Sequence, residues 1–256
     1  MKNTILFSLV IVLLVAVSRW PIPVAWGRPL PKSLFGFGQN FSSGGNITFI
    51  NSLAQNLGSS SGGTTSALNT TGANFIAACV SFWTSGTAVN FSSSPSNTWT
   101  KLTPYGQADL NPQIVIFYAE NAAVGTTQTF TSNTAYSYPS VTVMAFSGVK
   151  TTSSFDVQNG NSLGLGSFTI QPGSITPSLD HEMVISCISG YTGVGTDSFS
   201  INSSYIQKGN ITSVGSQSMA NGGAYIIQGT KSATNPTWTD ASNNTHASSI
   251  ASFKAQ

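Results

Sequence analysis

Charged residues are scarce in this sequence: seven Asp or Glu and nine Lys or Arg among 256 residues, or 6% of the chain. Soluble domains usually carry about 25%. The net charge is +2, and Lys and Arg do not cluster anywhere along the chain. Because nucleic-acid binding needs clustered positive charge, nucleic acid is excluded as a predicted partner. With 40 Ser, 29 Thr and 20 Asn, the surface is expected to consist of hydroxyls and amides.

Histidine and cysteine are also scarce, with two of each. Their spacing matches no zinc site, and the sequence has no Asp-x-Asp-x-Asp calcium loop. Four aspartates are scattered along the chain: Asp109, Asp156, Asp197 and Asp240. Neither glycine-rich nucleotide-binding motif is present. We therefore expect no metal and no cofactor.

The sequence lacks a recognisable set of catalytic residues. GSSSG (58–62) matches the G-x-S-x-G motif through Ser60, but no helix is expected after it, and that motif requires a strand-to-helix turn. Asp180, His181 and Glu182 are adjacent, yet neighbours on an extended chain point to opposite faces. His246 stands alone and is expected in a surface turn. We predict a protein that is not an enzyme, with a hydrolase as the third-ranked alternative.

Only one long apolar run occurs, and it lies at the start of the chain. Lys2 precedes Ile5–Val17, a run of 13 residues. A membrane span needs about 20 residues, whereas the apolar region of a signal peptide has about 7–15. We predict a signal peptide over residues 1–27, cleaved after Ser18 or Gly27. The protein is then secreted, extracellular or on the cell surface, and contacts a membrane only through this segment before cleavage.

The rest of the chain shows strand patterns and no helical periodicity. Residues 28–45 are rich in Pro and Gly and are expected to form a linker, and residues 46–256 a β-sandwich. Short segments rich in Val, Ile, Thr, Phe and Tyr alternate with Gly, Ser, Asn and Pro clusters, as in all-β sandwiches and barrels. The predicted strands are 47–50, 75–83, 98–104, 113–120, 127–131, 141–149, 167–171, 183–191, 205–207, 224–228, 237–239 and 249–253.

An internal repeat organises these strands. FIAACVSFW (75–83) aligns with MVISCISGY (183–191), which places Cys79 on Cys187 at a separation of 108 residues. The same offset places Ile116 on Ala224 and Phe130 on Trp238, and one residue of slippage places Phe146 on Phe253. We predict a jelly-roll-like β-sandwich built from two repeats of about 108 residues, spanning about 75–149 and 183–256. One pseudo-symmetric sandwich is favoured over two in tandem, because the join lacks a long Pro-rich linker.

Several motifs resemble a known group of proteins. The runs SNTWTKL, QIVIFYAENAAVGTTQTF, YPSVTVMAFSGVKTTSSFDV and SITPSLDHEMVISCISGYTG, with the closing SSIASFKAQ, carry the resemblance. They are similar to a widespread, functionally uncharacterised group of secreted bacterial proteins, with some phage structural proteins, over roughly residues 46–254. The resemblance implies an exported two-repeat β-sandwich and identifies no activity.

The two cysteines occupy matching positions in the repeat. An exported protein can contain a Cys79–Cys187 disulfide if the two strands lie side by side. The alternative is two small buried core residues that fill equivalent holes. A catalytic or metal role is not expected, because the chain lacks partner residues.

Aromatic residues and sequons supply the candidate binding sites. Tyr136 and Tyr138, in NTAYSYPS, have no counterpart in the second repeat and are the predicted ligand contacts. The other candidate rings are expected mainly in the core: Trp83, Trp99, Tyr105, Tyr118, Tyr191 and Trp238. The candidate N-glycosylation sites are Asn40, Asn46, Asn69, Asn90, Asn202, Asn210 and Asn243.

These observations favour a non-catalytic extracellular protein with a structural or adhesive role, such as a subunit of a surface fibre, filament or matrix. Self-association is expected through the N-terminal segment or through edge strands, which few charges protect here. The alternative is a lectin-like module whose partner is a glycan.

Overall fold

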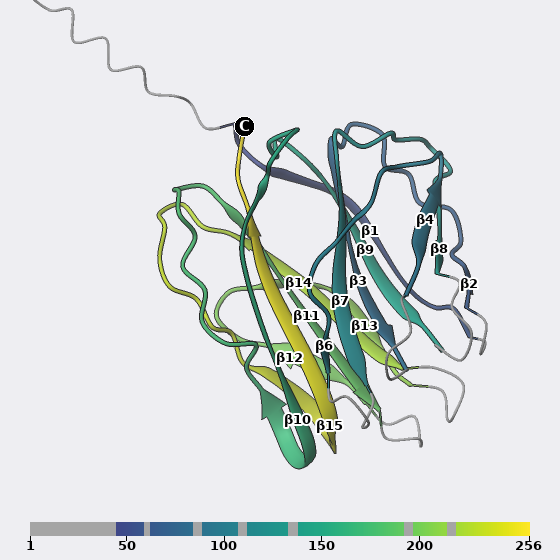
Figure 1. The fold of residues 1–256 in the computed structure, drawn as a ribbon, viewed down its shortest axis with the longest axis vertical. Coiled ribbons are helices and arrows are strands. Elements are labelled where there is room, and N and C mark those ends of the chain that lie inside the picture. The colour runs from purple at the N-terminus through teal and green to yellow at the C-terminus, as the bar shows by residue number, and fades with distance from the viewer. Residues whose placement is uncertain are drawn as a thin grey trace, which may run out of the picture. The chain divides into compact units, whose positions relative to one another are not determined.

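A computed structural model of the protein describes residues 45–58, 62–83, 89–106, 112–132, 138–191, 197–213 and 219–256. These residues form one compact unit built from strands (Figure 1). Within them, no helix is long and apolar enough to cross a membrane. The predicted signal peptide, nearly all of the predicted linker and Ser60 lie outside the described residues.

Two six-stranded antiparallel sheets make up the framework. The first sheet comes from the first half of the chain, in the order β1 (Thr48–Asn56), β9 (Ser140–Ser147), β3 (Phe75–Phe82), β7 (Gln113–Glu120) and β5 (Thr100–Lys101), with β6 (Tyr105–Gly106) also beside β7. The second sheet comes from the second half, in the order β10 (Phe155–Ile170), β15 (Trp238–Phe253), β11 (Met183–Tyr191), β14 (Ala220–Ile227) and β13 (Ile206–Ile211), with β12 (Phe199–Ile201) beside β15.

The two sheets share one core between their inner faces. Side chains alternate along each strand, so Phe75, Ala77 and Cys79 of β3 point inward together with Met183 and Cys187 of β11. All five are fully buried. A single core that takes side chains from both halves makes this one sandwich rather than two in tandem. The predicted all-β sandwich is confirmed, and each sheet is formed by one half of the chain.

Each sheet also has an outer core. On the first sheet, Ile76 and Val80 point outward beneath a small third sheet of β2 (Gly63–Thr64), β8 (Thr129–Ser132) and β4 (Phe91–Ser94). On the second sheet, Val184 and Ile188 pack against Trp238, Phe199 and Tyr205. The central strands β3 and β11 are therefore buried on both faces, which explains why their sequences are apolar almost throughout.

The strand order of the second sheet repeats that of the first, which is the arrangement that two duplicated halves predict. The pairing register differs from the sequence alignment by one residue in one place. Cys79 lies opposite Ile116, whereas Cys187 lies opposite Gly223 rather than Ala224. The alignment of β7 with β14 was thus one residue off, and the duplication itself stays a prediction.

Two strands are much longer than predicted. β10 spans 16 residues, of which the sequence pattern indicated only the last part, and β15 joins two predicted strands into one of 16 residues. Polar side chains support the unexpected part of β10: the Asn159 and Asn161 amides donate to the carbonyls of Ser174 and Gln171, at 3.1 and 3.2 Å. Gly160 lets the Tyr105 ring lie against the strand, since a Cβ there would stand 2.2 Å from the ring.

Candidate functional site

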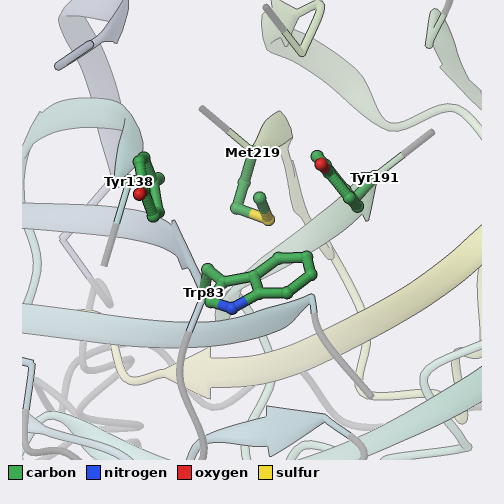
Figure 2. Close-up of a pocket in the computed structure, with 4 residues that line it drawn as sticks. All are labelled: Trp83, Tyr138, Tyr191 and Met219. Carbon is green, nitrogen blue, oxygen red and sulfur yellow. The ribbon is translucent and has the colours of Figure 1, made fainter. Parts of the chain in front are cut away.

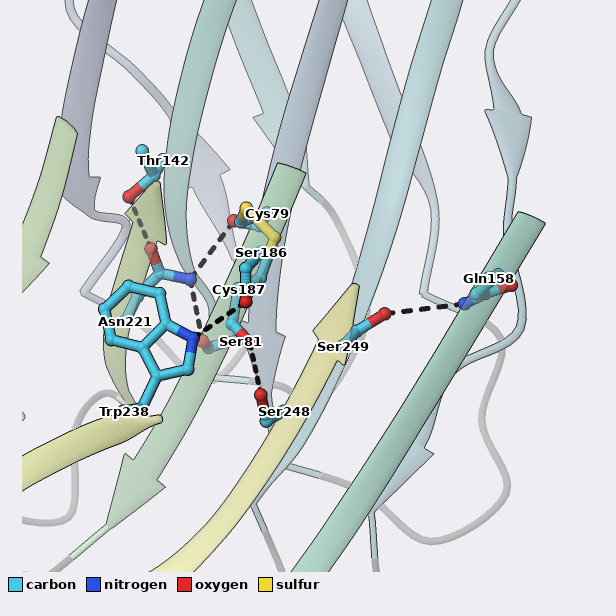
Figure 3. The surroundings of a disulfide bond; sticks show 10 residues. All are labelled: Cys79, Ser81, Thr142, Gln158, Ser186, Cys187, Asn221, Trp238, Ser248 and Ser249. Carbon is cyan, nitrogen blue, oxygen red and sulfur yellow. Dashed lines mark hydrogen bonds between the residues drawn. A yellow bond between two sulfur atoms is a disulfide. The ribbon is translucent and has the colours of Figure 1, made fainter. Parts of the chain in front are cut away.

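A disulfide between Cys79 and Cys187 joins the central strands of the two sheets, β3 and β11 (Figure 3). Their Cα atoms are 5.7 Å apart, and both residues are fully buried. Of the two alternatives left open by the sequence, the structure contains the disulfide rather than two thiols. It links two points 108 residues apart, and so fixes the spacing of the sheets at their centre.

Buried hydrogen bonds reinforce this link. Asn221, on β14 of the second sheet, donates through Nδ2 to the Cys79 carbonyl at 3.1 Å and to Ser81 Oγ at 2.7 Å (Figure 3). Its Oδ1 accepts from Thr142 Oγ1 of the first sheet at 2.6 Å. One amide therefore bonds to two strands of the opposite sheet. A bare backbone at Gly223 makes room for Thr142, because a Cβ there would meet its side chain at 2.7 Å.

Trp83 and Tyr191 stand four residues beyond the two cysteines. Because the spacing is the same on β3 and β11, both rings emerge at the same end of the central strands. Their centroids are 4.9 Å apart at an interplanar angle of 76°, an edge-to-face contact. The disulfide and this ring pair are therefore two successive links between the same two strands.

Tyr138 and Met219 complete a pocket around this ring pair (Figure 2). Tyr138 precedes β9 of the first sheet and Met219 precedes β14 of the second. The Met219 N–H donates to the Tyr138 carbonyl at 3.1 Å, and Ser140 Oγ donates to the Met219 carbonyl at 2.6 Å. The four residues line a cavity of about 220 Å³. Four separate segments, two from each sheet, thus build one site.

The backbone at Tyr138 is strained, with a φ of +45°. Residues other than glycine rarely adopt this left-handed region, which costs about 1–3 kcal/mol for a bulky side chain. Strain of this kind persists only where surrounding contacts impose it. Here the Met219 N–H bond to the Tyr138 carbonyl holds the backbone from which the Tyr138 ring extends into the pocket.

The sequence-based site assignments have mixed outcomes. Tyr138 lines the pocket, whereas Tyr136 lies outside the described residues. Trp83 and Tyr191 were expected mainly in the core but line the same pocket. Four of the candidate rings pack into the apolar cores instead: Trp99, Tyr105, Tyr118 and Trp238. Asn40 lies outside the described residues. The other six candidate sequons have exposed asparagines, as glycosylation requires: Asn46, Asn69, Asn90, Asn202, Asn210 and Asn243.

A second polar cluster lies on the outer side of the second sheet. His246 Nε2 bonds to Asp240 Oδ2 at 2.9 Å, and the Asn244 amide donates to both Asp240 and Asp197. Ser213 Oγ also donates to Asp197. The expectation that His246 sits in a surface turn was wrong: it is 1% exposed. Long β15 carries it into the sheet, and the two scattered aspartates come together around it.

The two buried carboxyls of this cluster differ in their pKa. Burial raises the pKa of Asp197, and the nearby Asp240 carboxylate adds to the effect. Burial acts on Asp240 in the same direction, but hydrogen bonds from His246 and from the N–H groups of Ser198 and Ser242 outweigh it, so its pKa lies below the usual range. Asp197 and Asp240 are thus two buried carboxyls joined through the Asn244 amide, which donates to both.

The three adjacent residues Asp180, His181 and Glu182 do not converge on a site. Asp180 is exposed and accepts from the Lys231 N–H at 2.8 Å, and His181 is exposed. Glu182 is buried, where it accepts from the Leu179 N–H at 2.9 Å, and burial raises its pKa. The three do not converge, but alternation along a strand is not the reason: Asp180 and His181 lie in an exposed turn, and Glu182 turns inward just before β11.

The described lining of the pocket is mainly aromatic. Its described lining contains three aromatic rings and a thioether, with no carboxyl, imidazole or basic group. Across the described ranges, no group of three or more His, Cys, Asp or Glu side chains is placed to hold a metal ion. Comparison with known proteins adds no identity: no family model, no curated protein and no solved structure matches this chain.

Proposed function

We propose that this protein is an exported, non-catalytic adhesive module that binds a small ligand in the aromatic pocket. The observation that carries the proposal is the convergence of Trp83, Tyr138, Tyr191 and Met219, from four chain segments, around one cavity. Half-buried aromatic rings give a large contact area with little loss of conformational freedom on binding. A saccharide stacked on Trp83 would make the module lectin-like.

The framework beneath the pocket supports this role. A binding site gains affinity when its contact residues are already in place before the ligand arrives. The disulfide, the Asn221 bonds and the Met219–Tyr138 bond fix both sheets on the inner side of the pocket. Export accords with the disulfide, which persists in oxidising compartments.

The proposal is tested by titrating the purified protein, in a calorimeter, with neutral mono- and disaccharides and with small quaternary and primary amines. At least one compound should bind, and Trp83→Leu should weaken that binding at least tenfold. Ile206→Ala, an exposed change on β13, is the matched control and should bind as the wild type does. Binding that is insensitive to Trp83→Leu, or no binding at all, would refute the pocket as the functional site.

A structural subunit is the second candidate, and exposed apolar residues on β10 favour it. Leu165 is 79% and Phe168 51% exposed, on the outermost strand of the second sheet. No charged residue lies between Asp156 and Asp180, so this edge lacks the charges that usually prevent strands from pairing. The partner of this edge would be β10 of a second copy, paired antiparallel.

Light scattering over a range of concentrations tests this assembly. Wild-type protein should associate as the concentration rises, and Leu165→Lys with Phe168→Lys should keep it monomeric while the unfolding midpoint stays unchanged. A wild-type protein that stays monomeric throughout would exclude a β10 interface.

We also propose that the two sheets are duplicated halves of one ancestral unit. The identical strand order and the disulfide between matching positions support this. A half expressed alone would then pair with a second copy of itself through its inner face. A half that remains an unfolded monomer would argue against the idea.

A further inference from the structure

The described residues that line the aromatic pocket offer few hydrogen-bonding groups through their side chains. Among the described residues that form it, only the Trp83 indole N–H and the two tyrosine hydroxyls can form hydrogen bonds through their side chains. A sugar presents several hydroxyls, each of which loses its bonds to water on binding and needs a replacement. A ligand group without donors or acceptors suits this lining better.

The rings are arranged to surround a ligand rather than to stack on one flat face. Figure 2 shows Trp83 across the floor, Tyr138 and Tyr191 standing on opposite sides, and Met219 between them. The interplanar angle of 76° between Trp83 and Tyr191 gives the pocket walls of different orientation. The apolar face of a sugar ring stacks on one extended aromatic platform, whereas a rounded group can contact several walls at once.

Aromatic faces carry partial negative charge and attract cations within about 6 Å of the ring centroid. A cation inside this pocket would lie beside three such rings, with no basic group among the described lining residues, while the Met219 side chain is 1% exposed and backs the pocket. A primary ammonium carries three N–H donors that need acceptors, and the lining offers few. A quaternary ammonium carries methyl groups only and needs none.

We propose that the pocket is an aromatic cage for a quaternary ammonium group, the headgroup type found in choline and its derivatives. The cavity of about 220 Å³ is smaller than the roughly 300–1,000 Å³ typical of sites for drug-sized ligands, so it fits one compact headgroup. This inference rests on the proposed function, since it names the ligand class of the same site.

The test compares choline with 3,3-dimethylbutan-1-ol, which has the same shape but carries no charge, by calorimetric titration of the wild-type protein. If ring quadrupoles supply the attraction, choline should bind at least tenfold more tightly than the neutral isostere. Ethanolamine, the primary amine of the same series, should bind more weakly than choline. Equal affinities for choline and its isostere would overturn the inference.

Two substitutions of Tyr138 separate the contribution of its aromatic face to choline binding from the contributions of its volume and its hydroxyl. Tyr138→Phe keeps the ring and should leave choline affinity within about threefold, whereas Tyr138→Leu keeps an apolar side chain and should lower it at least tenfold. The unfolding midpoint of each variant shows whether the fold is intact, and Trp83→Leu repeats the comparison at the floor of the pocket. Equal affinities for the two Tyr138 variants would contradict the cage.

The outcomes also separate this inference from the proposed function. If neutral saccharides bind through Trp83 and choline does not, the pocket is a ligand site but not an ammonium cage. If neither class of compound binds, both proposals fall.

Discussion

The two sheets of the sandwich share a strand order and an inner core but differ in their outer layers. The first sheet is covered by the small third sheet, which contributes the buried rings of Phe91 and Phe130, and residues 62–100 and 121–132 contain no Asp, Glu or His. The second sheet is covered by loops and by a buried network around Asp197, Asp240 and His246. Two sheets with the same strand order and a common inner core can therefore have their outer faces covered in two different ways.

One pair of aligned residues shows this difference at close range. Phe130 of the first outer core lies among rings, 6.2 Å from the centroids of both Phe91 and Trp99. Trp238 of the second outer core contacts Phe199 and also donates through Nε1 to Ser186 Oγ at 2.9 Å. The same position thus holds an apolar ring in one outer core and, in the other, an indole that also forms a hydrogen bond.

Removal of the disulfide between the two sheets should cause the largest loss of stability. Replacing both Cys79 and Cys187 by Ala opens a loop of 108 residues, and the chain-entropy account assigns about 4.7 kcal/mol to a loop of roughly this length. We expect the free energy of unfolding in urea to fall by about 3–5 kcal/mol. Wild-type protein unfolded with and without a reductant is the control, and a loss below about 1 kcal/mol would contradict the role of the disulfide.

The two outer cores should behave as independent units. Phe130→Ala and Trp238→Ala should each lower the free energy of unfolding by about 3–5 kcal/mol, because each removes a fully buried aromatic side chain. The two effects should add to within about 0.5 kcal/mol in the double variant, since the residues share no partner. Strong coupling in this cycle would mean that the outer layers are not separate.

Replacing Asn221, whose amide bonds to two strands of the opposite sheet, should lower stability less than replacing either buried ring of the outer cores. Asn221→Leu leaves Thr142 Oγ1 and Ser81 Oγ without their buried partner, and each unsatisfied group costs about 1–3 kcal/mol. We expect a loss of about 2–4 kcal/mol in chemical unfolding. Exposed Asn46→Ala is the matched control and should change stability by less than about 0.5 kcal/mol.

The buried carboxyls give the smallest and most specific effect, a pH dependence confined to the second sheet. Asp197 has a raised pKa, so its contribution to stability is full below the ordinary carboxyl pKa and is lost as the pH rises through the folded value. Asp240 has a lowered pKa, so its contribution is present above the ordinary value and is lost as the pH falls through the folded value.

Asp197→Asn removes the first of these two contributions. Relative to the wild type, the variant should therefore gain stability as the pH rises above about 4 toward neutral, in urea unfolding at a series of pH values. An unchanged stability difference between the two proteins across that range would show that Asp197 keeps its ordinary pKa.

Much of the framework follows from sequence pattern. The segment 75–83 predicts β3 because it is a short apolar run bounded by turn residues, and 183–191 predicts β11 for the same reason. The first part of β10 was missed because residues 158–166 are polar and glycine-rich, and their pairing depends on β15 and on amide bonds to distant carbonyls. Tertiary contacts there override local preference.

The pocket was only partly predictable. Tyr138 could be selected because its loop has no aromatic counterpart in the second repeat. Trp83 and Tyr191 align with each other, which indicated a core position but also places both at one end of the sandwich. Met219 carries no local sequence signal, because hydrogen bonds to the distant segment 138–140 bring it to the site.

Methyl NMR of Met219 is the most direct test of the claim that the two sheets meet in a ligand pocket. Met144 and Met183 lie in the central core and serve as internal controls. Titration with choline should shift the Met219 methyl resonance and leave the other two unchanged, and Trp83→Leu should abolish the shift. A ligand that binds while the Met219 resonance stays in place would contradict the account.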